Sequence, residues 1–472
     1  MLFSSFSFLF WFLPLVLLLY FLPSALSALL HKSPRWMPGY QNAVLLIASL
    51  FFYAWGEPLY LFLMIGTVLF DTLLGILIGR HQKSRFLLTV AVLFHIGMLF
   101  FFKYAAFFAA TVGLSVDAPA LPLGISFYTF QALSYLIDVY CGRVRPEKNP
   151  ALLGVYVALF PQLIAGPIVR YTDVARELRE RRHTVAGAAF GMRRFAAGLA
   201  KKLLLANPLG ALFVLLASRG SALSLLGALG ALLAFSFQIY FDFSGYSDMA
   251  IGLGRIFGFR FPENFRYPYI ARSVSDFWRR WHITLSSFFR EYVYFPLGGS
   301  RRGAWVTLRN LLIVWALTGL WHGAAWNFLL WGLYYFLLLA VQKFVLPRFS
   351  RPVPTPIAFL TTQLAVLLGW LLFAFDGSAP YLTPAACRSF LASLFGAHGL
   401  AARGDLYEIV RYLPLFLLAA LGATPLPHRI YRKTVSKRWG RWLRVALPLL
   451  ALALSVIELC DAAFNPFLYF RF

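Results

Sequence analysis

Acidic residues and cysteine are scarce in this chain. Its 472 residues include 18 Asp and Glu, and charged residues of both signs make up 13%. A soluble domain carries about 25% charged residues. The chain is instead 60% hydrophobic and 18% aromatic, so its composition excludes a soluble globular protein and indicates several membrane spans. The three cysteines, Cys141, Cys387 and Cys460, lie far apart in no disulfide or metal-binding pattern, and we expect them to be unpaired.

The excess of basic residues gives a formal net charge of +25. In a soluble chain this would suggest nucleic acid. Here Lys and Arg collect in short loops between apolar segments, which is typical of the cytoplasmic loops of membrane proteins. Anionic lipid headgroups then supply the counter-charge. We therefore expect a lipid bilayer, and no nucleic acid, as the partner of these residues.

Apolar segments of about 20 residues predict the membrane spans. The first five are expected at about 6–30, 43–55, 59–79, 86–110 and 123–140. Basic loops follow the first, third and fifth of them, which predicts an extracytoplasmic N-terminus. The first segment has no basic region before it and no cleavage signal, so we expect it to be a retained span.

The remaining chain is less regular. Prolines and a glycine interrupt the apolar segment 151–168, which is expected to re-enter the membrane or lie at its surface, followed by an amphipathic surface helix over 170–183. Further spans are expected at about 195–218, 222–240, 311–320, 324–346, 357–375, 413–421 and 445–459. The chain from 241 to 310 is expected to form short helices packed inside the protein. The basic segment 429–444 is expected to be cytoplasmic, and 376–404 is the largest insertion outside the membrane.

A histidine inside an apolar run is the strongest functional signal. His322 lies in LTGLWHGAAWNFLLWGLYYFLLL, residues 317–339. Ionisable residues within spans usually face a protein interior or a water-filled path and are functional candidates. Histidine also titrates near neutrality, which suits proton transfer. Gly319 and Gly323 are expected to leave room for a substrate, and Trp321 either packs or lines its channel. For His282, structural and functional roles are both open.

Polar residues concentrate between 238 and 299. Buried charges must be paired, so we expect Asp and Arg residues of this region to be partners. A structural ion-pair network is the favoured interpretation for Asp242, Asp248, Arg279, Arg280 and Arg290. Asn264, Tyr246 and His282 are candidates to orient a catalytic base or to stabilise an oxyanion. A lone histidine also fits a transporter, although the chain has no repeat with matched breaks, and no HExxH, GxSxG or phosphate-loop motif.

Several motifs together resemble the membrane-bound O-acyltransferase (MBOAT) family, in its alginate O-acetyltransferase branch. The motifs are FPQLIAGPIVRY at 160–171, FSGYSDMAIGLGRIFGFRFPENFRYPY at 243–269, SDFWRRWHITLSSFFREYVYFPLGG at 275–299 and TGLWHGAAWNF at 318–328. Residues 1–22, 122–140 and 465–472 extend the resemblance over nearly the whole chain.

The resemblance implies an all-α polytopic membrane protein with one domain over 1–472 and its core motifs at about 122–335. About 10–12 transmembrane helices would form a rim around a thin centre with re-entrant helices and opposed funnels. It implies that His322 is the catalytic histidine and that His282 supports it. Other possible supporting residues are Asn264, Tyr246, Asp248, Trp321 and Arg279.

The resemblance also implies the reaction. Acetyl-CoA would donate its acetyl group from the cytoplasm, and no cofactor or metal would be bound. An extracytoplasmic SGNH-like acetyltransferase partner would complete transfer to alginate, another exopolysaccharide or peptidoglycan. The protein would reside in the bacterial cytoplasmic membrane. A D-alanyl transferase of the teichoic-acid type, which takes its donor from a carrier protein, is the alternative enzyme. A non-enzymatic transporter is the alternative of another class.

Overall fold

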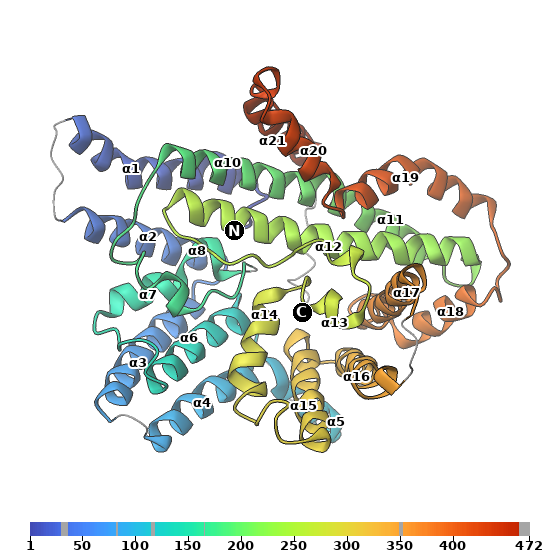
Figure 1. Ribbon diagram of the computed structural model, residues 1–472, viewed down its shortest axis with the longest axis horizontal. Coiled ribbons are helices and arrows are strands. Elements are labelled where there is room, and N and C mark those ends of the chain that lie inside the picture. The colour runs from blue at the N-terminus through green and yellow to red at the C-terminus, as the bar shows by residue number, and fades with distance from the viewer. Residues whose placement is uncertain (30–35, 82–83, 115–118, 165, 349–352, 462–472) are drawn as a thin grey trace. The chain divides into compact units, whose positions relative to one another are not determined.

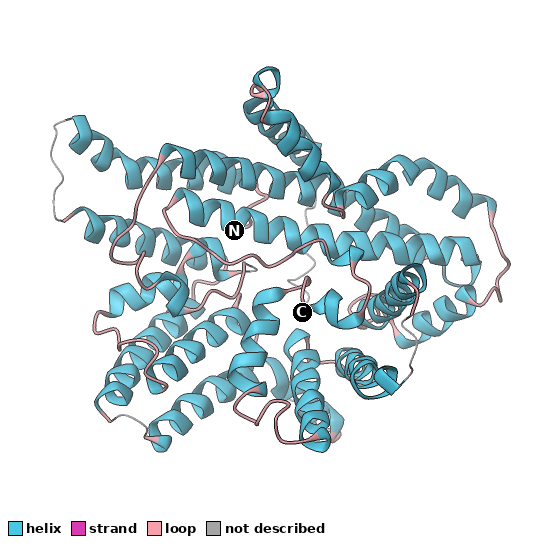
Figure 2. Ribbon diagram, in the orientation of Figure 1, coloured by secondary structure: helices cyan, strands magenta, loops and turns pink. Residues whose placement is uncertain are grey.

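The structure is a computed structural model. It describes residues 1–29, 36–81, 84–114, 119–164, 166–348 and 353–461. Every regular element in these ranges is a helix (Figure 2). The predicted all-α polytopic class is therefore confirmed.

Nine helices in the described ranges are long and apolar enough to cross a membrane. They are Ser7–Ser27, Tyr60–Arg80, Arg85–Thr111, Val185–Ala217, Leu225–Ile256, Ala304–His322, Trp326–Arg348, Thr355–Ala374 and Arg438–Cys460. A pair bent by 72°, Arg403–Gly422 with Leu426–Val435, would raise the number to ten if it formed one broken span and not a re-entrant loop. Ten is the lower end of the expected range. The helices Met37–Ala54 and Ile125–Tyr140, which the sequence also suggested as spans, do not meet the same criteria of length and hydropathy.

The chain divides into two compact units. The first contains residues 1–197 and 246–263. Its helices are α1 (Leu13–Leu29), α2 (Met37–Ala54), α3 (Tyr60–Arg80), α4 (Arg85–Leu99), α5 (Ala105–Thr111), α6 (Ile125–Tyr140), α7 (Pro150–Ala158), α8 (Phe160–Leu163) and α9 (Tyr171–Val174). Within it, α2 packs on α7, and α6 packs on both α3 and α4. Phenylalanine rings fill its core, among them Phe8, Phe52 and Phe160.

The second unit contains residues 198–245 and those from 264 onward. Its helices are α11 (Asn207–Ala217), α13 (Val274–Trp278), α14 (Ile283–Phe289), α15 (Ala304–His322), α16 (Trp326–Ala340), α17 (Thr355–Ala374), α18 (Pro384–Leu394), α19 (Arg403–Gly422), α20 (Leu426–Val435) and α21 (Leu443–Asp461). Two long helices, α10 (Val185–Ala200) and α12 (Leu225–Ile256), contribute residues to both units. Figure 1 shows α15, α16 and α17 side by side in the second unit.

The span expected to end at residue 240 is longer than predicted, because it belongs to the helix α12. It continues through the polar run to Ile256, because the charged groups of that run are paired. Asp242 lies 2.7 Å from the ammonium group of Lys202, and both side chains are about 3% exposed. Asp248 accepts a hydrogen bond of 2.8 Å from Arg194. Pairing removes the cost of burying these charges, so their polarity does not end the helix.

The prediction of an amphipathic surface helix over 170–183 is wrong. Only the single-turn helix α9 forms there, followed by hydrogen-bonded turns. Tyr171 and Val174 are buried. The Tyr171 hydroxyl donates to the Glu147 carboxylate at 2.9 Å, and Arg179 pairs with the same carboxylate. These contacts hold the segment against the first unit, so it is not a free helix on the membrane surface.

Candidate active site

His282 occupies a strained position between two short helices. It precedes α14 with φ 43° and ψ 55°, in the left-handed region. Residues other than glycine seldom adopt this conformation, and such strain tends to cluster at functional sites. Two backbone hydrogen bonds hold the turn in place, from the N–H of Ile283 to the carbonyl of Asn264 at 3.0 Å and from Arg266 to Arg280 at 2.9 Å. The chain around Asn264 is therefore paired with the chain around His282.

The side chain of Asn264 fixes the tautomer of His282. The Asn264 amide oxygen lies 3.1 Å from Nδ1 of His282. It also accepts from the backbone N–H of Thr284 at 3.3 Å and from the Thr284 hydroxyl at 2.9 Å. Because a backbone N–H can only donate, the amide must turn its oxygen toward this group. Nδ1 of His282 then carries the proton, and Nε2 carries the lone pair.

The second ring nitrogen of His282 is available to a ligand. Nε2 is buried and has no hydrogen-bond partner among the residues that the structure describes. His282 is 1% exposed, and burial lowers its pKa to about 3. Desolvation disfavours the charged imidazolium, so the ring is neutral at physiological pH. A neutral imidazole with a free lone pair can accept a hydrogen bond from a hydroxyl group.

His322 is the last residue of α15 and is enclosed by aromatic rings. It is 4% exposed. Its ring centre lies 5.0 Å from that of Trp331 on α16 and 5.2 Å from that of Phe373 on α17, and both rings are nearly perpendicular to it. The helix ends here because Gly323 adopts an extended conformation, and the chain then turns into α16. Three adjacent helices thus position this imidazole.

Trp321 brings the two histidines into one cluster. Its ring centre lies 4.9 Å from that of His322 and 5.6 Å from that of His282. Phe243 of α12 stands edge-on against His282, with ring centres 4.7 Å apart. The cluster therefore combines two buried imidazoles with indole and phenyl walls. Such walls exclude water, which strengthens hydrogen bonds made by a substrate inside.

Two other candidates have partners in the first unit. The ring of Tyr246 stacks on Phe3 with centres 4.5 Å apart. Asp248 pairs with Arg194, whose guanidinium also binds Glu263 through two hydrogen bonds of 3.0 and 2.6 Å. This forked ion pair favours a structural role for Asp248.

The expected pairing of Asp and Arg residues within 238–299 is largely wrong. Asp242 and Asp248 are held by Lys202 and Arg194, which come from earlier helices. Within the region itself, Arg280 pairs with Asp276 at 3.1 Å. Arg279 and Arg290 are exposed, so they do not enter the buried cluster. Ion pairs depend on which helices pack together, and proximity along the sequence does not reveal this.

The glycines near His322 allow close packing of helices. The space that the sequence suggested for a substrate is occupied by neighbouring protein atoms. A side chain at Gly319 would strike the backbone carbonyl of Phe328, and one at Gly332 would strike that of Trp315. The ring of Phe328 fills the space beside Gly323. The two helices α15 and α16 therefore approach each other closely, which fixes the angle at which α15 delivers His322.

The sequence did not identify the aromatic residues that surround the two histidines, or a second buried polar pair. Phe243, Trp331 and Phe373 lie on three separate helices, so no spacing marks them. His95 and Asp71, on α4 and α3 of the first unit, form a fully buried pair with Nε2 and Oδ1 2.9 Å apart. The rule that singled out His322 also applies to them, because both lie within apolar spans. The described residues contain no group of three or more His, Cys, Asp or Glu placed to hold a metal ion.

Comparison with known proteins gives the family. The model of the MBOAT, membrane-bound O-acyltransferase family, matches residues 147–375. The chain is 35% identical to the probable alginate O-acetylase AlgI of Pseudomonas putida, over 100% of both chains. It is 35% identical to the peptidoglycan O-acetyltransferase of Helicobacter pylori, over 79% of this chain and 77% of that protein. It is 28% identical to the teichoic acid D-alanyltransferase of Bacillus subtilis, over 47% and 59%.

These similarities agree with the helical architecture. Many apolar helices make the chain a multi-pass membrane protein, and its relatives are bacterial O-acyltransferases. The resemblance that the sequence motifs indicated is thereby confirmed. The chain is a multi-pass bacterial membrane O-acyltransferase and belongs to the membrane-bound O-acyltransferase family.

Proposed function

We propose that this chain transfers the acetyl group of cytoplasmic acetyl-CoA toward hydroxyl groups of an extracytoplasmic polysaccharide. The observation that carries the proposal is the cluster in which neutral His282 and buried His322 share the indole of Trp321. The relatives named for acetylation of alginate and peptidoglycan support acetyl as the acyl group. Acceptor candidates are alginate, another exopolysaccharide and peptidoglycan.

The two histidines would have different roles. A general base works best when its pKa lies near the operating pH. The pKa of His282, lowered to about 3, makes it a poor base. Its Nε2 lone pair instead suits it to accept a hydrogen bond from a second hydroxyl of the acceptor and so to orient the attacking one. Because Nε2 carries no proton, His282 would not donate to an oxyanion.

His322 would then act as the base. It would take the proton of the acceptor hydroxyl while the hydroxyl oxygen attacks the thioester carbonyl carbon. The carbon–sulfur bond breaks as the tetrahedral intermediate collapses, and the imidazolium returns the proton to the leaving thiolate of CoA. An ester and free CoA are formed with no net change in protons. Direct acetylation of His322 is the less favoured route.

Topology and partners complete the proposal. Basic loops after the first, third and fifth spans support an N-terminus outside the cytoplasm and a location in the cytoplasmic membrane. Lys and Arg of the cytoplasmic face would meet the phosphates of acetyl-CoA. An SGNH-like acetyltransferase outside the membrane would pass the acetyl group to the polysaccharide. No cofactor is proposed.

Similarity to the Bacillus subtilis protein supports a second candidate. That relative is named a D-alanyltransferase. A carrier protein would then supply D-alanine to the same histidine cluster. The longer and stronger similarity to the acetyltransferases favours acetyl.

The test measures acetyl loss from labelled acetyl-CoA by purified protein in nanodiscs, with polysaccharide acceptors added in turn, each with and without an SGNH-like acetyltransferase. His322→Ala should lower transfer by about 10²–10⁴-fold, the usual contribution of a general base. His81→Ala, which changes an exposed histidine at the end of α3, is the matched control and should retain full activity. Equal rates in wild type and His322→Ala would contradict the proposal. Transfer from a D-alanyl carrier and none from acetyl-CoA would establish the alternative.

A further inference from the structure

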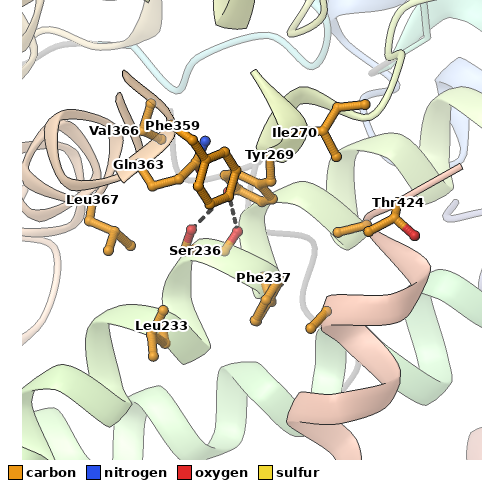
Figure 3. Close-up of a pocket in the computed structure, with 12 residues that line it drawn as sticks. Leu233, Ser236, Phe237, Tyr269, Ile270, Phe359, Gln363, Val366, Leu367 and Thr424 are labelled. Carbon is orange, nitrogen blue, oxygen red and sulfur yellow. Dashed lines mark hydrogen bonds between the residues drawn. The ribbon is translucent and has the colours of Figure 1, made fainter. Parts of the chain in front are cut away.

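A cavity of about 280 Å³ lies in the second unit, between α12, α17 and α19 (Figure 3). Leu233 and Phe237 of α12 form one wall, Phe359 of α17 a second, and Ala420 and Ala423 at the end of α19 a third. Small-ligand pockets usually measure roughly 300–1,000 Å³. The cavity is therefore smaller than a site for a whole cofactor, and its size suits a single chain or small group.

The few polar groups of the lining already have partners. The Tyr269 hydroxyl donates to the carbonyl of Ser236 at 2.6 Å and accepts from Nε1 of Trp370 at 3.1 Å. The amide of Gln363 donates to the carbonyl of Ala271 at 3.1 Å, and the hydroxyl of Thr424 donates within its own turn. A polar ligand would gain few hydrogen bonds here and would lose its own hydration. The lining therefore selects a hydrocarbon.

The surroundings of the cavity supply such a hydrocarbon. The helices α12 and α17 are spans by length and hydropathy, and α19 is apolar enough to enter the membrane as part of the bent pair. Leu233 and Phe359 are each about 40% exposed at the rim, and the medium facing spanning helices is lipid. Apolar cavities stay dry, and an empty one loses the dispersion contacts that an occupant would restore. A lipid chain provides these contacts without crossing water.

One wall of the cavity continues along the chain into a helix that carries exposed basic residues. The wall continues past Gly422, the last residue of α19, to Ala423 and Thr424. The chain then bends by 72° into α20, which carries Arg429, Arg432 and Lys433 and no acidic residue. All three are exposed. A basic helix at a sharp angle to a span is typical of a helix lying at the membrane surface among anionic headgroups.

We propose that the cavity and α20 together bind one anionic phospholipid, with an acyl chain between α12, α17 and α19 and its phosphate against Arg429, Arg432 and Lys433. The headgroup supplies the negative charge that α20 lacks, and the chain fills the apolar cavity. The ring of Tyr269 forms the inner wall, so the bound chain would rest on the residue that holds Trp370.

The test is native mass spectrometry of the purified protein after incubation with phosphatidylglycerol or with phosphatidylcholine of the same chains. Wild type should retain phosphatidylglycerol at least about tenfold better, since headgroup charge and buried chain act together. Ala423→Phe fills the cavity and should remove most of this binding. Ala453→Phe, which adds the same ring on an exposed site of α21, should leave it unchanged. If Ala423→Phe does not fold, Ala420→Leu at the open side of the cavity replaces it.

A charge variant tests the other half of the site. The double change Arg432→Gln and Lys433→Gln should lower phosphatidylglycerol binding, whereas Arg301→Gln with Arg302→Gln, an exposed pair elsewhere, should not. Equal retention of phosphatidylcholine would overturn the assignment of an anionic lipid. Undiminished binding by the folded cavity-filling variant would overturn the acyl-chain site and leave headgroup adsorption on α20 as the explanation.

Discussion

The amide oxygen of Asn264 lies 3.1 Å from Nδ1 of His282 and also accepts both hydrogen bonds of Thr284. One side chain therefore determines which nitrogen of a buried histidine carries the proton and which carries the lone pair. The ring is neutral, and its lone pair points away from Asn264. This relationship gives the histidine cluster a defined protonation state before any substrate binds.

Removal of the Asn264 side chain should weaken both the fold and the reaction. Asn264→Ala removes the oxygen that accepts from the buried Nδ1–H of His282 and from Thr284, which costs about 1–3 kcal/mol of stability. A freed ring no longer orients the acceptor, and a small misplacement lowers kcat by about 100-fold. Thermal melting and labelled acetyl transfer measure the two effects.

The variant Asn264→Asp separates orientation from packing. It keeps the acceptor oxygen but places a negative charge beside His282, which favours the imidazolium and raises the pKa of His282. Transfer should then fall as the pH is lowered from 8 to 6, where wild type changes less. If Asn264→Ala melts earlier yet keeps its kcat, Asn264 has only a packing role.

The low pKa of His282 predicts an acid-sensitive fold. The folded pKa is about 3, whereas an unfolded histidine titrates near 6.5. Below about pH 6.5, His282 binds a proton in the unfolded chain but stays neutral in the folded chain. The free energy of unfolding therefore falls as the pH is lowered toward 3. The loss at pH 5 is about 2 kcal/mol.

Melting curves of wild type and His282→Gln between pH 8 and pH 5 measure this contribution. The glutamine variant lacks the titrating group, so its stability should depend less on pH. Parallel curves for the two proteins would show that His282 titrates normally in the folded state.

Glycine substitutions should distinguish close helix packing from simple helix propensity. Gly319→Ala and Gly332→Ala place a methyl group against the carbonyls of Phe328 and Trp315. Backbone atoms cannot move aside cheaply, so each change should destabilise the protein by about 1–3 kcal/mol and reduce transfer by shifting His322. Gly97→Ala on α4 has open space and should stabilise by up to about 1 kcal/mol. Thermal shift measurements compare the three, and equal responses would refute the packing role.

Cysteine labelling should establish the orientation of the chain. Cys141 is exposed at the end of α6, beside a basic loop that we expect in the cytoplasm. With Cys387 and Cys460 replaced by serine, a membrane-impermeant maleimide should label Cys141 in inside-out vesicles and spare it in right-side-out vesicles. Leu114→Cys, in the loop after α5 that lacks basic residues, should show the opposite pattern in a background without other cysteines. Labelling of both from one side would contradict the predicted topology.

Much of the candidate site was predictable because its key residues are conspicuous locally. His322 interrupts an apolar run, and the motif around His282 mixes aromatic and basic residues. Asn264 was a candidate, but its control of the His282 tautomer depends on backbone pairing between residues 264–266 and 280–283. Tyr246, Asp248 and Arg279 were named for the same polar region. The structure gives them other surroundings, because sequence neighbours on a helix point in different directions.

The sequence by itself determined the helical class, the positions of most spans and the identity of two buried histidines, because hydropathy and length are properties of one segment. Only the tertiary structure decided that α12 continues through its polar run, that Gly319 is a packing site, and that Asp242 pairs with Lys202. Each of these depends on a partner from another part of the chain. Burying a charge costs free energy unless an opposite charge from another helix pairs with it. Likewise, a glycine is required only where another helix lies too close for a side chain, and the packing of the helices decides both.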